Sequence, residues 1–295
     1  MSPHSINART SLLLLALAAG GADALSAQEL GQSQPGQFPD ERFATSEIGP
    51  PSMGPARTIP CTSFDDDSHY PLGYEETLDL AIQAVFLGRA DPEKDTRKCF
   101  FRMAEALTQH LVLEDPKDPE PRYWYSASMA LRANEEGGRT QVGLAQRAHE
   151  QARLTLNVAP DHAGAQHVLG RLHAAVMRLS GFKRFIATRI LGGKALSEAS
   201  WKTAETFLAA AASLQPGVPI HHYELGALYL DTDRPELALA AFERVLACPL
   251  IHPADRAVYV RAREMIEQSR REMAGEAPHR ATLRRPGRRR AGSRR

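Results

Sequence analysis

The sequence predicts an all-α fold in which helical hairpins stack into a solenoid, and two observations support this prediction. Apolar residues recur at helical spacing through most of residues 72–274, and no stretch alternates in the manner of a strand. Alanine is abundant whereas aromatic residues make up only 6% of the chain, a balance that suits closely packed helices. Hydrophobic residues at 43% and charged residues at 24% exclude a wholly disordered or collagen-like chain.

The N-terminal segment has the three parts of a secretory signal peptide. Residues 1–11 contain one arginine and no acidic residue, Leu12 to Ala19 form an unbroken apolar run, and small residues follow. The run has about half the length that a bilayer span needs. We therefore expect residues 1–27 to be a signal peptide cleaved after Ala24 or Ala27, and the mature protein to be periplasmic or secreted in a bacterium. The alternative is a buried helix or an uncleaved stub.

Two further segments lack the helical pattern. Residues 28–71 are rich in Gln, Ser, Gly and Pro, and residues 275–295 combine many arginines with little apolar surface. Neither segment can bury enough apolar surface to offset the entropy lost on ordering. We expect a disordered linker before the helical domain and a disordered Arg-rich tail after it.

The chain has three cysteines, Cys61, Cys99 and Cys248, which are too few for a disulfide framework. Export would place them in an oxidising compartment, where one pair and one free thiol can form. The sequence leaves the pairing open.

Within residues 72–274 one order of residue types recurs: Leu-Gly and then an aromatic residue on one helix, Ala and then Phe or Leu on the next, and a closing proline. This order is that of the tetratricopeptide repeat, and it occurs in about four irregular copies that close at Pro116, Pro160, Pro216 and Pro249. Gly and Ala let the helices of a hairpin approach closely, while large side chains fill the gaps. The predicted packing positions are Trp124, Leu169, Gly170, Leu225, Gly226, Tyr229, Ala238 and Phe242.

The last copy has the most regular pattern. Its second helix begins near Pro235, which suits a first turn, and Pro249 follows its end. The three residues Asp231, Thr232 and Asp233 are the candidate caps of this helix. The closing prolines are separated by 44, 56 and 33 residues, so we expect the two longer copies to carry insertions in or near their hairpin turns.

The insertion from Leu179 to Leu196 predicts a basic amphipathic helix, because cationic and apolar residues interleave there. One interpretation is a helix that packs across its own solenoid, with its cationic ends in solvent. The other is a contact with a membrane surface or an acidic partner. The candidate partner-binding residues, in this insertion and in the tail, are Lys183, Arg184, Arg189, Arg284, Arg285 and Arg288.

Several short motifs are arranged as in a known family. They include Trp124-Tyr125-Ser126, His167-Val168-Leu169-Gly170, Arg184-Phe185-Ile186-Ala187 and Ser197-Glu198-Ala199-Ser200-Trp201. On these motifs, the segment from Tyr123 to Met265 resembles the regulator of microtubule dynamics family, whose members carry divergent tetratricopeptide repeats. The resemblance implies the helical-repeat fold. We do not expect microtubule association to carry over, because an exported bacterial chain does not meet tubulin.

The sequence lacks the short motifs of metal and catalytic sites. It has no HExxH, no CxxC, no Gly-rich phosphate loop and no GxSxG. His162, His167 and His173 are spaced so that they do not share one helical face, and we interpret His167 and His173 as packing positions. We therefore expect no cofactor, no metal and no enzymatic activity.

Together these observations predict an exported, non-catalytic scaffold whose repeat surface binds another protein or a peptide. The alternative is an envelope or anionic-polymer adaptor that binds anionic lipid or nucleic acid through the basic insertion and the tail. Salt separates the two hypotheses, because binding driven by charge weakens steeply as the salt concentration rises.

Overall fold

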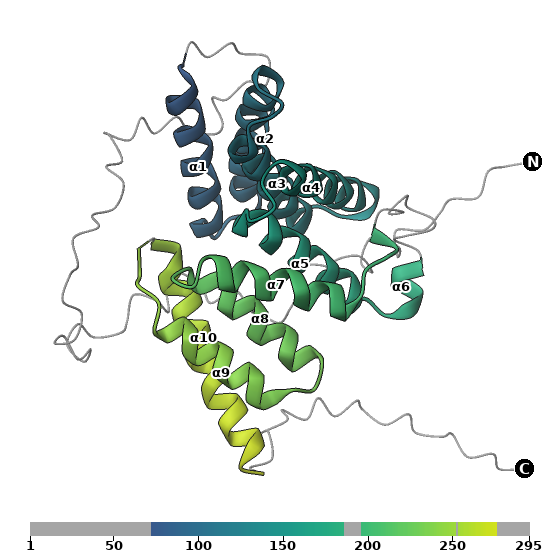
Figure 1. The fold of residues 1–295 in the computed structure, drawn as a ribbon, viewed down its shortest axis with the longest axis vertical. Helices are drawn as coiled ribbons and strands as arrows, with labels where there is room; N and C mark the ends of the chain where they lie inside the picture. The colour runs from purple at the N-terminus through teal and green to yellow at the C-terminus, as the bar shows by residue number, and fades with distance from the viewer. Residues whose placement is uncertain (1–71, 186–195, 252, 276–295) are drawn as a thin grey trace, which may run out of the picture.

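A computed structural model of the chain describes residues 72–185, 196–251 and 253–275, and within these ranges there is no strand. The all-α prediction is therefore confirmed (Figure 1). The helices are α1 (Tyr74–Ala90), α2 (Lys94–Glu114), α3 (Pro119–Glu135), α4 (Gly138–Val158), α5 (Ala163–Arg178), α6 (Gly181–Phe185), α7 (Trp201–Leu214), α8 (Pro219–Asp231), α9 (Pro235–Leu246) and α10 (Pro253–Met273). The expected signal peptide, linker and nearly all of the expected tail lie outside the described residues.

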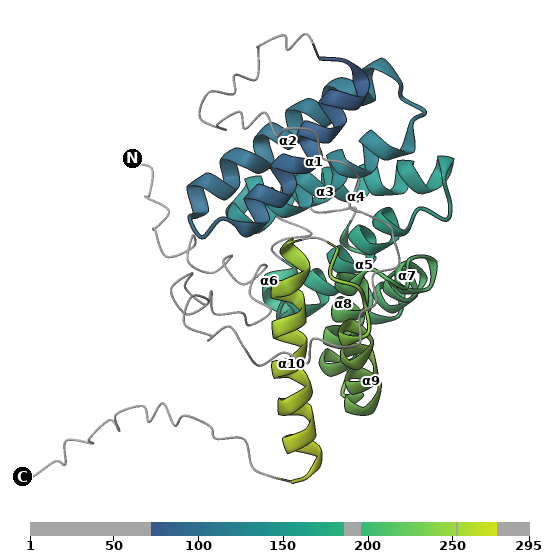
Figure 2. The same cartoon turned by 90° about the vertical axis from the view of Figure 1, so that its left-hand side faces the viewer.

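The helices pair as the hairpins α1–α2, α3–α4, α5–α7 and α8–α9, and α10 packs on the last of them. The first helices of successive hairpins also touch, since α1 contacts α3, α3 contacts α5, and α5 contacts α8. Helix α10 contacts α8 and returns to contact α1 (Figures 1 and 2). We call α1, α3, α5, α8 and α10 the inner row, and α2, α4, α7 and α9 the outer row.

Glycines on the inner row let three of the four hairpins close tightly. A Cβ atom on Gly226 would lie 2.7 Å from the ring of Phe242, which is nearer than real Cβ contacts allow. Two other hairpins use the same device, so that a large outer-row side chain fills the space that the glycine leaves. The three pairs are Gly88 with Phe101, Gly170 with Leu208, and Gly226 with Phe242.

The predicted packing positions lie in the hairpin cores or at their edges. Leu169, Ala238 and Phe242 have no exposed surface, and the first of them packs with Ala165 and Val168. The half-buried side chains are those of Trp124, Leu225 and Tyr229. Tyr229 contacts two cores, one between α5, α7 and α8 and one between α8, α9 and α10. The large apolar side chains at these positions thus join neighbouring hairpins.

In most of the hairpins, the residues at the start of a helix are ones that favour a helix start. Proline occupies the first turn of α3, α8 and α9. The Asp118 side chain accepts a hydrogen bond from the backbone N–H of Glu120 at 3.0 Å, and the Ser200 hydroxyl accepts one from the N–H of Thr203 at 3.1 Å. These bonds satisfy backbone donors that a helix leaves unpaired at its start.

The expected caps of α9 are wrong. Its cap position is Arg234, which makes no side-chain capping bond. Thr232 instead ends α8, because its hydroxyl donates to the carbonyl oxygen of Leu228 at 2.9 Å, and Asp233 adopts a left-handed φ of 57°. Arg234 is held by two hydrogen bonds of 2.9 Å to the Glu205 carboxylate on α7. A contact between hairpins therefore fixes this turn.

The expectation that the longer copies carry insertions near their turns is right for one hairpin and wrong for another. Between α5 and α7 the chain includes α6, with residues 186–195 outside the described part. In the α3–α4 hairpin the turn is only Glu136 and Gly137, and the helices themselves are long, at 17 and 21 residues. Helices α8 and α9 have 13 and 12 residues. The extra length therefore extends the helical surface there.

Across the residues that the structure describes, no helix has both the length and the apolar character that crossing a bilayer requires.

Candidate functional site

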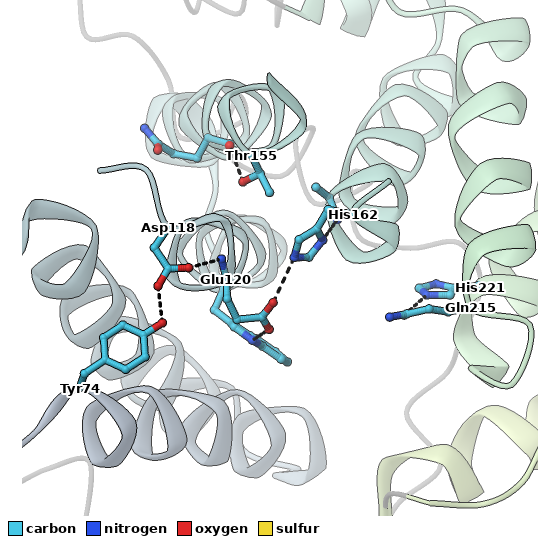
Figure 3. Close-up of polar contacts among 10 residues, drawn as sticks. Tyr74, Asp118, Glu120, Thr155, His162, Gln215 and His221 are labelled. Atoms are coloured by element: carbon cyan, nitrogen blue, oxygen red, sulfur yellow. Dashed lines mark hydrogen bonds and ion pairs between the residues drawn. The ribbon is translucent and has the colours of Figure 1, made fainter. Parts of the chain in front are cut away.

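Polar side chains join neighbouring helices of the inner row (Figure 3). The hydroxyl of Tyr74 on α1 donates to the carboxylate of Asp118 at the start of α3. Burial, together with this neighbouring carboxylate, raises the pKa of the Tyr74 phenol. The carboxylate that begins α3 therefore also fixes α1 against it.

Glu120 on α3 makes the next connection. Its carboxylate accepts a hydrogen bond from Nε1 of Trp124 at 2.8 Å and lies 3.2 Å from Nε2 of His162 at the start of α5. Nδ1 of His162 accepts the backbone N–H of Ala165, so the ring proton is on Nε2 and is donated to Glu120. This hydrogen bond lowers the pKa of Glu120. The carboxylate is thus ionised and held by two donors.

Aromatic rings cover the same part of the inner row. The ring of Tyr123 lies between Trp124 and His162, with centroid distances of 4.8 and 4.7 Å. Phe86 of α1 meets Trp124 edge-on, with the centroids 6.1 Å apart. A Cβ atom on Gly164 would lie 2.4 Å from the Tyr123 ring, so only glycine leaves room for this packing. We call Phe86, Tyr123 and Trp124 the aromatic cluster; all three side chains are half-buried.

A histidine pair connects α5 to α8. Nδ1 of His167 lies 3.0 Å from Nδ1 of His221. Figure 3 shows the other contact of His221, whose Nε2 lies 3.3 Å from the amide oxygen of Gln215. An amide oxygen only accepts, so His221 donates from Nε2 and accepts from His167 at Nδ1. Burial lowers the pKa of His221 to about 4 and that of His167 well below its ordinary value. Both rings are neutral at pH 7.

Two ion pairs also connect α5 to α8. Nε of Arg171 lies 3.0 Å from the Glu224 carboxylate, and Arg178 lies 2.7 Å from that of Asp231. Both acidic residues are on α8, and Glu224 is buried. The charge of Arg171 is therefore already matched by a carboxylate of the fold.

Arg89, at the end of α1, is different. It is exposed and forms no ion pair with any residue that the structure describes, and its guanidinium carbon lies 5.9 Å from the centre of the Phe86 ring. Desolvation, followed by the charge of Arg171, lowers its pKa, while Tyr123, Asp255 and Glu224 act in the opposite direction. Groups from α3, α5, α8 and α10 thus all act on this side chain.

The candidate partner-binding residues proposed from sequence are not brought together in the described part of the chain. Lys183 and Arg184 are described, and both are half-buried. The guanidinium of Arg184 donates to the carbonyl oxygens of Met177 and Leu179 at 3.0 and 3.1 Å, so it caps the end of α5. This use gives no support to the surface-adaptor hypothesis. The remaining candidates, Arg189, Arg284, Arg285 and Arg288, lie outside the described residues.

Sequence reasoning missed Arg89 and Arg171, although the sequence carries a signal for both. Each directly follows the glycine that closes its hairpin, Gly88 in the first case and Gly170 in the second. The two arginines therefore occupy the same register position of two repeats. Aligning the repeats on their glycines would have singled out this position.

The described cysteines differ in state. Cys99 is disulfide-bonded, whereas Cys248 is a buried free thiol whose pKa is raised by burial. Cys61 lies outside the described residues. Among the described side chains, no group of three or more His, Cys, Asp or Glu is arranged to hold a metal ion.

Comparisons with known proteins identify the family of the chain. Among solved structures, a thermophilic tetratricopeptide-repeat protein of Thermus thermophilus is 20% identical, with 70% of this chain and 92% of that chain covered and a TM-score of 0.43. No curated protein matches the sequence. Residues 68–270, more than half of the chain, match the family described as regulator of microtubule dynamics protein 1-3. The chain therefore belongs to the regulator of microtubule dynamics family, as the resemblance of its motifs implies.

Proposed function

We propose that this protein is a non-catalytic scaffold that binds another protein or a peptide through its inner row of helices. The observation that carries the proposal is the exposed Arg89 over the Phe86 ring of the half-buried aromatic cluster, on a row of helices that contact one another. Stacked hairpins present extended surfaces that bind partners without catalytic groups. Family membership supports this fold, while the function is argued from the site.

The residue types at this site suit a protein partner. Tyr, Trp and Arg are enriched at protein interfaces, because each combines a large contact area with a polar group. The rings of the aromatic cluster are half-buried and supported from α1, α3 and α5, so little side-chain freedom is left to lose on binding. A ligand would therefore meet a preorganised surface.

Selection from a peptide display library on the folded chain tests this proposal. We expect enriched peptides that, when bound, slow amide hydrogen exchange in α1, α3, α5 and α8 more than in α2 and α4. Phe86→Ala is expected to weaken binding about ten-fold or more, as at a typical interface contact. Leu113→Ala, at a side chain on α2 that is 73% exposed, is the matched control and should leave affinity unchanged. Protection confined to the outer row, or no enrichment at all, would contradict the proposal.

We also propose that the chain is exported. The pattern of residues 1–27 supports this, and so does the disulfide at Cys99, because stable disulfides are typical of oxidising compartments. Expression of the full chain in a bacterium, followed by N-terminal sequencing of the envelope and culture medium, should give a first residue of Leu25 or Gln28. Intact Met1, together with an alkylatable Cys99 thiol in the cytoplasm, would refute export.

A further inference from the structure

We infer that the ligand of the inner row presents an acidic side chain, Asp or Glu, and that Arg89 receives its carboxylate. This inference rests on the proposed function and adds to it the chemistry of the ligand. It follows from the position of Arg89 beside the aromatic cluster and from the pairing of the charged groups around it.

The other charged groups near Arg89 have partners within the fold. Glu120 is bonded to Trp124 and His162, and Arg171 is paired with Glu224. Glu224 and Asp255 influence Arg89, but neither lies within ion-pair distance of it. Among the described residues beside the aromatic cluster, Arg89 is thus an exposed cation that lacks a carboxylate partner.

The surroundings of Arg89 favour a carboxylate ligand. Nearby protein removes part of its hydration and Arg171 repels it, and both effects make its charged form less stable. An arriving carboxylate would offset both effects. The planar guanidinium can form two parallel hydrogen bonds to a carboxylate, and this geometry strengthens the pair and makes it specific. The ring of Phe86 lies below the guanidinium, which restricts the directions from which a ligand can approach.

The neighbouring rings indicate that the carboxylate belongs to a peptide. A free anion such as inorganic phosphate would use only the guanidinium, whereas the aromatic cluster offers apolar contacts to the residues on either side of an acidic side chain. Inorganic phosphate is therefore the probe for the competing possibility. If it displaced Asp and Asn peptides equally well, Arg89 would not be the receptor of a peptide carboxylate.

Three matched nine-residue peptide libraries test the inference, each with a fixed central Asp, Asn or Lys and random flanks. On the wild-type protein we expect Asp to be enriched over Asn by about ten-fold, the net contribution of one charged hydrogen-bonded pair. In Arg89→Gln the ratio should fall to near one, and in Arg89→Glu the Lys library should be preferred. Arg102→Gln is the control, because Arg102 is exposed on α2 in the outer row; it should keep the wild-type ratio.

The salt dependence of binding by the wild-type chain is a second test of the inference, and it does not depend on whether the variants fold. The Asp-over-Asn ratio should shrink as salt is raised to about 1 M, where the screening length is about 3 Å. Enrichment of all three libraries with no preference for Asp would overturn the inference and leave the scaffold proposal intact. Enrichment of none of them would overturn the scaffold proposal itself.

Discussion

Replacing Phe242 with alanine is expected to lower the free energy of unfolding by about 3–5 kcal/mol. The ring has no exposed surface and lies at the centre of the core between α8, α9 and α10, where it also packs against Tyr223 with a centroid distance of 5.6 Å. Urea denaturation followed by circular dichroism measures the loss. Leu237→Ala on the same helix is the control, because that side chain is 47% exposed and should cost far less.

The glycine opposite Phe242 gives a sharper form of this prediction. Gly226→Ala alone should destabilise the protein despite the better helix propensity of alanine, since the new Cβ would lie 2.7 Å from the Phe242 ring. In the double variant Gly226→Ala/Phe242→Ala, the added methyl group enters the space that the ring vacated. The double variant should therefore lose at least about 1 kcal/mol less than the sum of the two single variants. Additive losses would mean that these two residues do not define the hairpin contact.

Acidification from pH 7 to pH 5 is the second change with a large expected effect. Burial lowers the pKa of His149 and of His221 to about 4, and it also lowers the pKa of His167 and His173. The unfolded chain, with histidine pKa values of about 6.5, then binds more protons than the folded chain. Stability is therefore complete above about pH 6.5 and falls as the pH decreases toward 4, by on the order of 2 kcal/mol at pH 5 for each of His149 and His221.

The charges around these rings explain why protonation is unfavourable. His221 faces His167 and His222, and His149 faces His173 and Arg153, so each new positive charge meets another donor or cation. Thermal melting of wild type and His221→Asn between pH 7 and pH 5 measures the effect. The variant should show a shallower slope, because one buried titrating group is gone. Equal slopes for the two proteins would contradict the prediction.

The sequence predicts the hairpins because their signals are local. Helical spacing, prolines in first turns and the Leu-Gly pairs of α5 and α8 are each contained within a single repeat. The turn before α9 could not be predicted in this way, because Arg234 is positioned by Glu205, 29 residues earlier. The insertion that was expected near the turn between α3 and α4 failed for a related reason. The 44-residue proline spacing shows that this copy has extra residues, but it does not show whether they lengthen the turn or the helices.

The candidate site was harder to predict than the fold because it is assembled from distant segments. Arg89 is an ordinary surface arginine in the sequence of α1, and it becomes distinctive only when α3, α5, α8 and α10 bring their charges near it. The histidine pair is similar, since His167 and His221 are 54 residues apart. Aligning the repeats shows which positions such residues occupy. Which of them pair with one another depends on how the hairpins stack.

The contact between α1 and α10 couples the stability of the two ends of this array of repeats. In an open solenoid each repeat touches only its neighbours, so an end can fray while the middle persists. Here the two ends of the described array touch each other, and a fluctuation that detaches α10 also removes a neighbour of α1. Forming that contact closes a loop that includes every hairpin between them, and the entropy of closing a loop depends only weakly on its length. The first and last hairpins are therefore thermodynamically coupled, so that local unfolding of one destabilises the other.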